Sequence, residues 1–145
     1  TDLRTAIAIL KINTDLERMG DEAVKIKRNQ QNVQKEAQCI TNMGIEVIFM
    51  VKNCIDSFVT GNMKMATDVI IHDQEVNALN KDIARTYINK IKNNEMSFDE
   101  AYGIVRMSKN LERIGDHAKN VAEDVIFLVS GSDIRHKADL HTDKK

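Results

Sequence analysis

The chain has 145 residues, the size of one domain, with 42% hydrophobic residues, no proline and no tryptophan. Its 21 basic and 22 acidic residues are mixed along the sequence and give a formal net charge of −1, so neither a basic surface for nucleic acid nor a polybasic membrane anchor is expected. Three charged residues interrupt the most apolar stretch, 43–59, which therefore does not resemble a membrane span. Cys39 and Cys54 fall too far apart on one predicted helix to pair, which is typical of reduced thiols in a cytoplasmic protein.

Helical periodicity predicts an all-α fold of long antiparallel helices, and no stretch of useful length alternates with period two. We place the helices at about 2–30, 39–60, 62–93 and 98–130. Gly61 is expected to cap the second helix, and Ser97 with Glu100 forms a capping box for the fourth. Gly131 is predicted to end the fourth helix, leaving 132–145 as a charged, largely frayed tail.

One motif occurs twice, as LERMGDEA at 16–23 and LERIGDHA at 111–118. A repeat at a distance near a hundred residues indicates a duplicated helical unit. We therefore divide the chain into 1–38, the last helix of one unit with a linker, and 39–131, a complete three-helix unit.

Each copy of the motif carries two acids four residues apart, Glu17 and Asp21 in the first and Glu112 and Asp116 in the second. Like charges at this spacing repel each other on a helix, so the pairs need an explanation. In the first helix, the spacing of the apolar seam that begins at Leu3 continues onto Glu17 and Asp21. The pattern predicts that both pairs lie on packing faces rather than in solvent.

The other faces of the two motif helices are expected to meet solvent. On the first helix this face carries Asp15 and Glu22, and on the last helix it carries Asn110 and His117. We interpret His117 as a surface residue before a metal ligand, and His72 is assigned no role.

The third helix supplies polar neighbours for the second acid pair, because Asp73, Asn77 and Asn80 lie on its apolar face. An antiparallel hairpin about residue 96 would place Asn80 level with Glu112, and Asn77 level with Asp116. Buried carboxylates of this kind require a counter-charge.

Three explanations of these acids remain open from the residues alone. Lys109 or Lys119 could turn inward and neutralise the acids, or the acids could lie solvated at the edge of a metal-free helical scaffold. Alternatively, the oxygen ligands could hold a hard cation such as Mg²⁺, Ca²⁺ or Mn²⁺, or iron in a carboxylate cluster. A carboxylate-bridged metalloenzyme is a weaker hypothesis, because the sequence offers no clear histidine ligands.

Both motif copies, the Met43-Gly44 pair and the DQEVNAL run from Asp73 resemble the PhoU family of phosphate-signalling regulators, over almost the whole chain. The resemblance implies tandem three-helix bundles in a cytoplasmic adaptor that has no catalytic activity and meets the membrane only through its partners. Those partners would be a phosphate ABC transporter, contacted through its ATPase subunit, and a sensor histidine kinase, both of which the adaptor would restrain.

The resemblance also implies acidic motifs that hold iron or zinc clusters, or bind magnesium or manganese. The corresponding residues here are Glu17, Asp21, Asp73, Asn77, Glu112 and Asp116. Asn77 stands where the family commonly has an acid. Because the first two helices of the first repeat are missing from this chain, helix 2–30 is expected either to pack beside the other three or to find partners in a second copy, giving a homodimer or higher oligomer.

Overall fold

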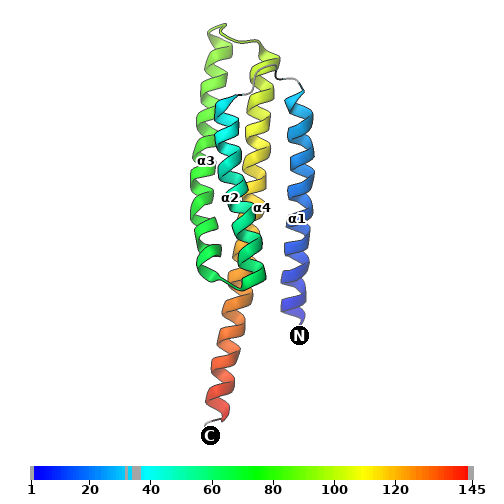
Figure 1. The fold of residues 1–145 in the computed structure, drawn as a ribbon, viewed down its shortest axis with the longest axis vertical. Helices are drawn as coiled ribbons and strands as arrows, with labels where there is room; N and C mark the ends of the chain where they lie inside the picture. Colours follow the sequence, from blue (N-terminus) through cyan, green and yellow to red (C-terminus); the bar gives the residue numbers. More distant parts are fainter. Residues whose placement is uncertain (1, 32, 34–36, 144–145) are drawn as a thin grey trace.

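Four long helices run antiparallel along an elongated bundle in the computed structural model (Figure 1), which describes residues 2–31, 33 and 37–143, with side chains to residue 131. The helices are α1 (Leu3–Gln30), α2 (Gln38–Thr60), α3 (Met63–Lys92) and α4 (Phe98–Asp143). Every element within the described ranges is helical, so the all-α prediction is confirmed.

The helix ends follow the local chemistry of the sequence. Gly61 ends α2 with a left-handed φ of 69°, a conformation that glycine adopts without a steric penalty. The Asn62 side chain then accepts a hydrogen bond from the backbone N–H of Met65 and caps α3. At the start of α4, the Glu100 backbone N–H donates to the Ser97 hydroxyl at 3.3 Å, as the predicted capping box requires.

The predicted end of the fourth helix at Gly131 is wrong, because the backbone of α4 continues to Asp143. Among the described glycines only Gly61 has a positive φ, so Gly131 keeps a helical conformation instead of terminating the helix. A glycine inside a helix lowers its stability by only about 1 kcal/mol relative to alanine, and the following segment contains no proline. Figure 1 shows the end of α4 projecting beyond the other helices.

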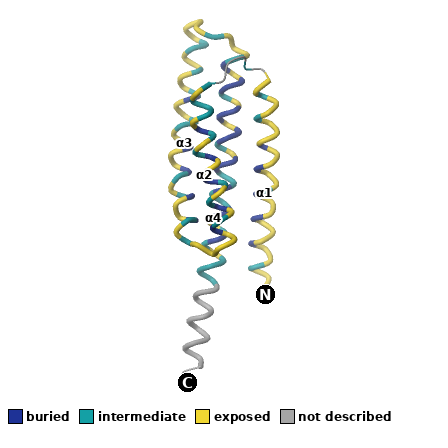
Figure 2. The backbone as a smooth tube through the Cα atoms, in the orientation of Figure 1, coloured by how far each residue is buried: buried dark blue, intermediate teal, exposed yellow. Residues whose placement is uncertain are grey.

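Helix α4 is the central element, because it packs against each of the other three helices. Figure 2 shows a buried band along α4, whereas most of α1 is exposed. The small residues of α4 lie in this band, with Ser108, Ala118 and Ala122 completely buried, and they allow the neighbouring helices to approach closely. The largest fully buried side chains of the core are Met43, Met50, Val69, Val76, Val121 and Val125.

Within the described chain α1 packs on α4 alone, so the expected packing beside the other three helices is seen only in part. The face it uses differs from the predicted one. Its buried residues are Ala8, Ile12, Asp15, Met19 and Glu22. By contrast, Leu3 is 74% exposed and Leu10 65% exposed, and Glu17 and Asp21 are also exposed.

Candidate functional site

A cluster of acids lies between α3 and α4. Asp73, on the buried stripe of α3, is only 3% exposed and is electrostatically coupled to Asp116 and Glu112 of α4. Gly115 of α4 faces the same carboxylate, because a Cβ at this glycine would lie 3.5 Å from Asp73 Oδ1. The glycine backbone of α4 therefore lies directly against the buried carboxylate of α3.

Amide side chains of α3 hold the cluster in register. Asn77 Nδ2 donates to Asp73 Oδ2 at 3.2 Å, and Asn80 Nδ2 donates to Glu112 Oε2. The Ser108 hydroxyl donates to Asn80 Oδ1 at 2.8 Å, which leaves the amide nitrogen of Asn80 directed at Glu112. The predicted hairpin register of Asn80 and Glu112 is confirmed by this contact.

The cluster carries more negative charge than its surroundings neutralise. Burial raises the pKa of Asp73, and the neighbouring Asp116 carboxylate raises it further. Burial likewise raises the pKa of Asp116, with Glu112 acting in the same direction. Lys109 Nζ lies 2.7 Å from Glu112 Oε1, and Lys119 Nζ lies 3.9 Å from Asp73 Oδ2. These two lysines oppose the pKa increases but do not cancel them.

One oxygen of the cluster lacks any partner in the described part of the chain. Asp73 Oδ1 is buried and accepts no hydrogen bond there, although a buried carboxylate oxygen normally does. Carboxylate and amide oxygens form the donor set that hard cations take in proteins. The residue types therefore suit a hard cation, and Asp73, Glu112 and Asp116, with the amide oxygen of Asn77, are the candidate ligands, although the three carboxyl groups do not bring one oxygen each within 4.8 Å of the others in the described chain.

The first motif copy does not join this cluster. Glu17 and Asp21 lie on the exposed side of α1, and Glu17 receives a hydrogen bond from Asn13 at 3.5 Å within the same helix. Because α1 packs on α4 through its other face, the prediction that these two acids lie on a packing face is wrong for this chain.

The residues that do hold α1 on α4 were predicted to meet solvent. Asp15 Oδ1 lies 2.9 Å from His117 Nδ1. Asn110 Nδ2 donates to Glu22 Oε2 at 2.8 Å, and Asn29 Nδ2 donates to Asn110 Oδ1 at 2.9 Å. The prediction that His117 is a surface residue is therefore wrong, because its side chain is only 18% exposed against α1.

The hydrogen bonds to Glu22 determine its charge state. Burial alone would raise the pKa of Glu22, but the hydrogen bonds from Asn110 and Lys25 and the positive charges of Lys25 and Arg113 together lower it. A signal for this interface exists in the sequence, since Asp15 and Glu22 continue the helical spacing of Ala8, Ile12 and Met19.

No helix in the described ranges combines the length and the apolar character needed to cross a membrane.

Comparison with known proteins supports the resemblance to the PhoU family. The family model for the PhoU domain matches residues 1–29 and 40–125. The chain is 34% identical over 142 residues to the phosphate-specific transport system accessory protein PhoU homolog of Pseudomonas putida, covering 94% of this chain and 56% of that protein.

Further relatives carry the same name. The homolog of Clostridium acetobutylicum is 34% identical over 138 residues, covering 92% of this chain and 63% of that protein. The chain thus spans about three-fifths of the length of these relatives. The matched proteins are named as accessory or regulatory proteins, in agreement with the prediction that the chain is not an enzyme.

Two solved structures share the fold. The crystal structure of PhoU from Pseudomonas aeruginosa superposes with a TM-score of 0.83 at 33% sequence identity, covering 90% of this chain and 65% of that one. The phosphate transport system regulatory protein PhoU from Streptococcus pneumoniae superposes with a TM-score of 0.81 at 23% identity, covering 90% of this chain and 64% of that one.

Proposed function

Because the chain belongs to the PhoU domain family, we propose that it regulates phosphate uptake as a cytoplasmic adaptor without a reaction of its own. The adaptor would restrain a phosphate ABC transporter by contacting its ATPase subunit, and would convey the state of the transporter to a sensor histidine kinase. The observation that carries this proposal is the family match over 1–29 and 40–125, together with relatives named as accessory proteins of the phosphate-specific transport system.

We further propose that the cluster between α3 and α4 binds a metal ion, either in an iron or zinc cluster or as Mg²⁺ or Mn²⁺. Asp73, Glu112 and Asp116 would supply carboxylate oxygens, with Asn77 in the place of a fourth acid. The support is the buried Asp73 Oδ1, which no described group satisfies, beside carboxyl groups whose pKa values are raised. A cation here would neutralise the excess charge and connect α3 to α4.

The exposed acids of α1, Glu17 and Asp21, would bind metal only together with a further helix. Glu17 and Asp21 would serve as metal ligands when another helix covers their side of α1. The exposed side chains of Leu3, Ile7 and Leu10 on α1 support a homodimer or higher oligomer as the source of that cover.

The regulatory role is tested in the cell that encodes the chain. Deleting the gene should raise phosphate uptake and the expression of phosphate-starvation genes in phosphate-rich medium, and the wild-type gene should reverse both effects. Purified chain should also capture the transporter ATPase and the sensor kinase of the same cell. Unchanged uptake and unchanged gene expression after deletion would reject the adaptor.

The metal site is tested by elemental analysis of protein purified without chelator. In a His72→Gln background, which removes the histidine beside Glu46 and Glu75, stoichiometric metal should be present, and it should be lost when Glu112→Ala/Asp116→Ala is added. The variant Asp99→Asn is a matched control, because Asp99 is an exposed acid at the start of α4, outside the cluster. Metal retained by the double variant would place the ion elsewhere.

The alternative is a metal-free helical scaffold, and one observation favours it specifically. Lys109 and Lys119 already approach Glu112 and Asp73 and supply part of the counter-charge. Absence of metal from the wild type, even after incubation with iron, zinc, manganese and magnesium, would support the scaffold and reject the metal site.

A further inference from the structure

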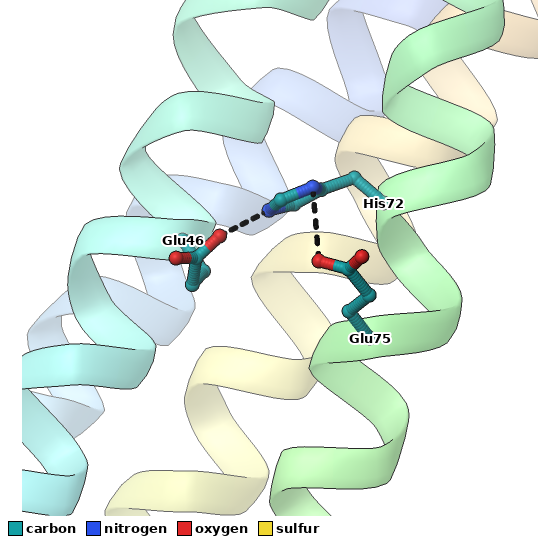
Figure 3. Close-up of side chains that lie close together, drawn as sticks. All are labelled: Glu46, His72 and Glu75. Atoms are coloured by element: carbon teal, nitrogen blue, oxygen red, sulfur yellow. Dashed lines mark hydrogen bonds and ion pairs between the residues drawn. The ribbon is translucent and has the colours of Figure 1, made fainter.

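A second group of potential ligands lies where α3 meets α2 (Figure 3). His72 of α3 points toward α2, where its Nε2 lies 2.5 Å from Glu46 Oε2. The other ring nitrogen, Nδ1, lies 3.5 Å from Oε2 of Glu75, one turn along α3. One ligand atom from each of the three residues lies within 4.8 Å of the others, an arrangement that no other group of histidine, cysteine and acidic residues shows in the described part of the chain.

The sequence builds this group in two steps. His72 and Glu75 are three residues apart, so they share one face of α3. The aromatic ring of Phe49 on α2 packs against the imidazole with the ring centroids 4.9 Å apart. This contact fixes the ring, whose side chain is 19% exposed, on the side of α3 that faces α2.

Access to the group is open. The Glu46 side chain is 40% exposed and that of Glu75 is 68% exposed, in contrast to the fixed imidazole. Both carboxylates line a surface groove between α2 and α3 with a volume of about 550 Å³. An ion could therefore reach the two carboxylates from this groove, and the glutamates could rotate to bring it to the imidazole, which is itself partly exposed.

We propose that Glu46, His72 and Glu75 form a binding site for a divalent first-row transition-metal ion, with Zn²⁺ as the reference ligand. One imidazole nitrogen and two carboxylates suit Zn²⁺, Fe²⁺, Co²⁺ or Mn²⁺, whereas Mg²⁺ and Ca²⁺ prefer oxygen ligands alone. Three protein ligands leave a coordination position for water. The site differs in chemistry from the all-oxygen cluster between α3 and α4, and it does not depend on that cluster or on the proposed regulation.

The competing explanation is an ion-pair triad in which a protonated imidazole bridges the two carboxylates. The two explanations differ in the response to added metal. A metal site binds the ion through a neutral imidazole and releases any proton that the ring carries, whereas an ion-pair triad binds no added ion and releases no proton.

The test is calorimetric titration of the full chain with Zn²⁺ after metal removal, in the background Glu112→Gln/Asp116→Asn, which disables the other cluster. We expect one bound zinc per chain, and at least about 10-fold weaker binding in His72→Gln, Glu46→Gln and Glu75→Gln, because even lost outer-shell partners of a metal weaken binding that much. Millimolar Mg²⁺ should not compete. At free zinc about 100 times Kd, Tm should rise by about 5–10 °C.

His117→Gln is the matched control, because His117 also contacts a carboxylate, that of Asp15, but belongs to no three-ligand group among the described residues. It should bind zinc like the background protein. The Glu75→Gln variant replaces only an exposed carboxylate by an amide of the same size, so its helical circular dichroism should match that of the parent. The proposal is overturned if His72→Gln binds zinc unchanged, if Mg²⁺ displaces the zinc, or if light scattering shows that zinc is bound only as chains associate.

Discussion

Replacing Gly115 by alanine should change two properties in opposite directions: it should stabilise the bundle and weaken metal binding between α3 and α4. Alanine in a helix interior is about 0.5–1 kcal/mol more favourable than glycine, which corresponds to a rise in Tm of about 1–4 °C for a chain of this size. The new Cβ would lie 3.5 Å from Asp73 Oδ1, Met50 Sδ and Val76 Cγ1, which is ordinary van der Waals contact. The fold should therefore accept the methyl group, while the methyl covers Asp73 Oδ1, the buried side-chain oxygen that accepts no hydrogen bond among the described residues.

Gly20 provides the matched control, because it occupies the same position in the first motif copy and a Cβ there meets nothing within 4 Å. In chelator-treated protein, Gly20→Ala and Gly115→Ala should both raise the urea midpoint. Metal binding is then measured with Mn²⁺ or Zn²⁺ in a His72→Gln background, which disables the site between α2 and α3. Gly115→Ala should weaken this binding, and Gly20→Ala should leave it unchanged. A strongly destabilised Gly115→Ala would contradict the described packing, and unchanged metal affinity would show that Asp73 Oδ1 is not a ligand.

Three other predictions follow from the charges and burial of single residues. Asp116→Asn should stabilise the chelated protein near pH 8, and its advantage should shrink toward pH 4. The raised pKa of Asp116 means that the folded state binds this proton more tightly than the unfolded state, so its contribution to stability falls as the pH rises through that pKa. Urea titrations across this pH range measure the difference. Asn110→Ala should lower the free energy of unfolding by about 1–3 kcal/mol, since buried Glu22 loses a hydrogen-bond donor, and denaturant melts at pH 7 check this value. Burial raises the pKa of the Cys54 thiol to about 12, so mass spectrometry should find this thiol unmodified by iodoacetamide at pH 8 until the protein unfolds.

The sequence determines the helices and one of the two polar interfaces well, because both depend on local information. Gly61 and Ser97 mark helix ends through contacts that span only a few residues. The cluster around Asp73 and Glu112 could be predicted because a short turn fixes the register of the α3–α4 hairpin, so counting residues from the turn is sufficient.

The packing face of α1 could not be predicted in the same way, because this helix carries two rows of apolar residues with equally good helical spacing. One seam leads from Leu3 to Glu17 and Asp21, and the other runs through Ile12 and Met19. Helical periodicity does not rank them. The partner groups that decide between them lie on α4, more than eighty residues away in the sequence, so only the tertiary fold reveals the choice.

The repeat itself explains how α1 and α4 recognise each other. In the alignment that pairs Leu16 with Leu111, Asp15 corresponds to Asn110 and Glu22 corresponds to His117. The observed contacts are crossed, since Asp15 meets His117 and Glu22 meets Asn110.

Crossed contacts between equivalent positions are the signature of a two-fold, self-complementary interface, here formed between two antiparallel helices of one chain. Two identical acidic motifs would repel each other at such an interface. The second copy carries Asn110 and His117 where the first carries Asp15 and Glu22, so each of these two acids meets a hydrogen-bonding partner on α4. The differences between the two copies therefore allow them to pack together, and their shared acids remain on other faces, with Glu112 and Asp116 directed toward α3 and Glu17 and Asp21 exposed.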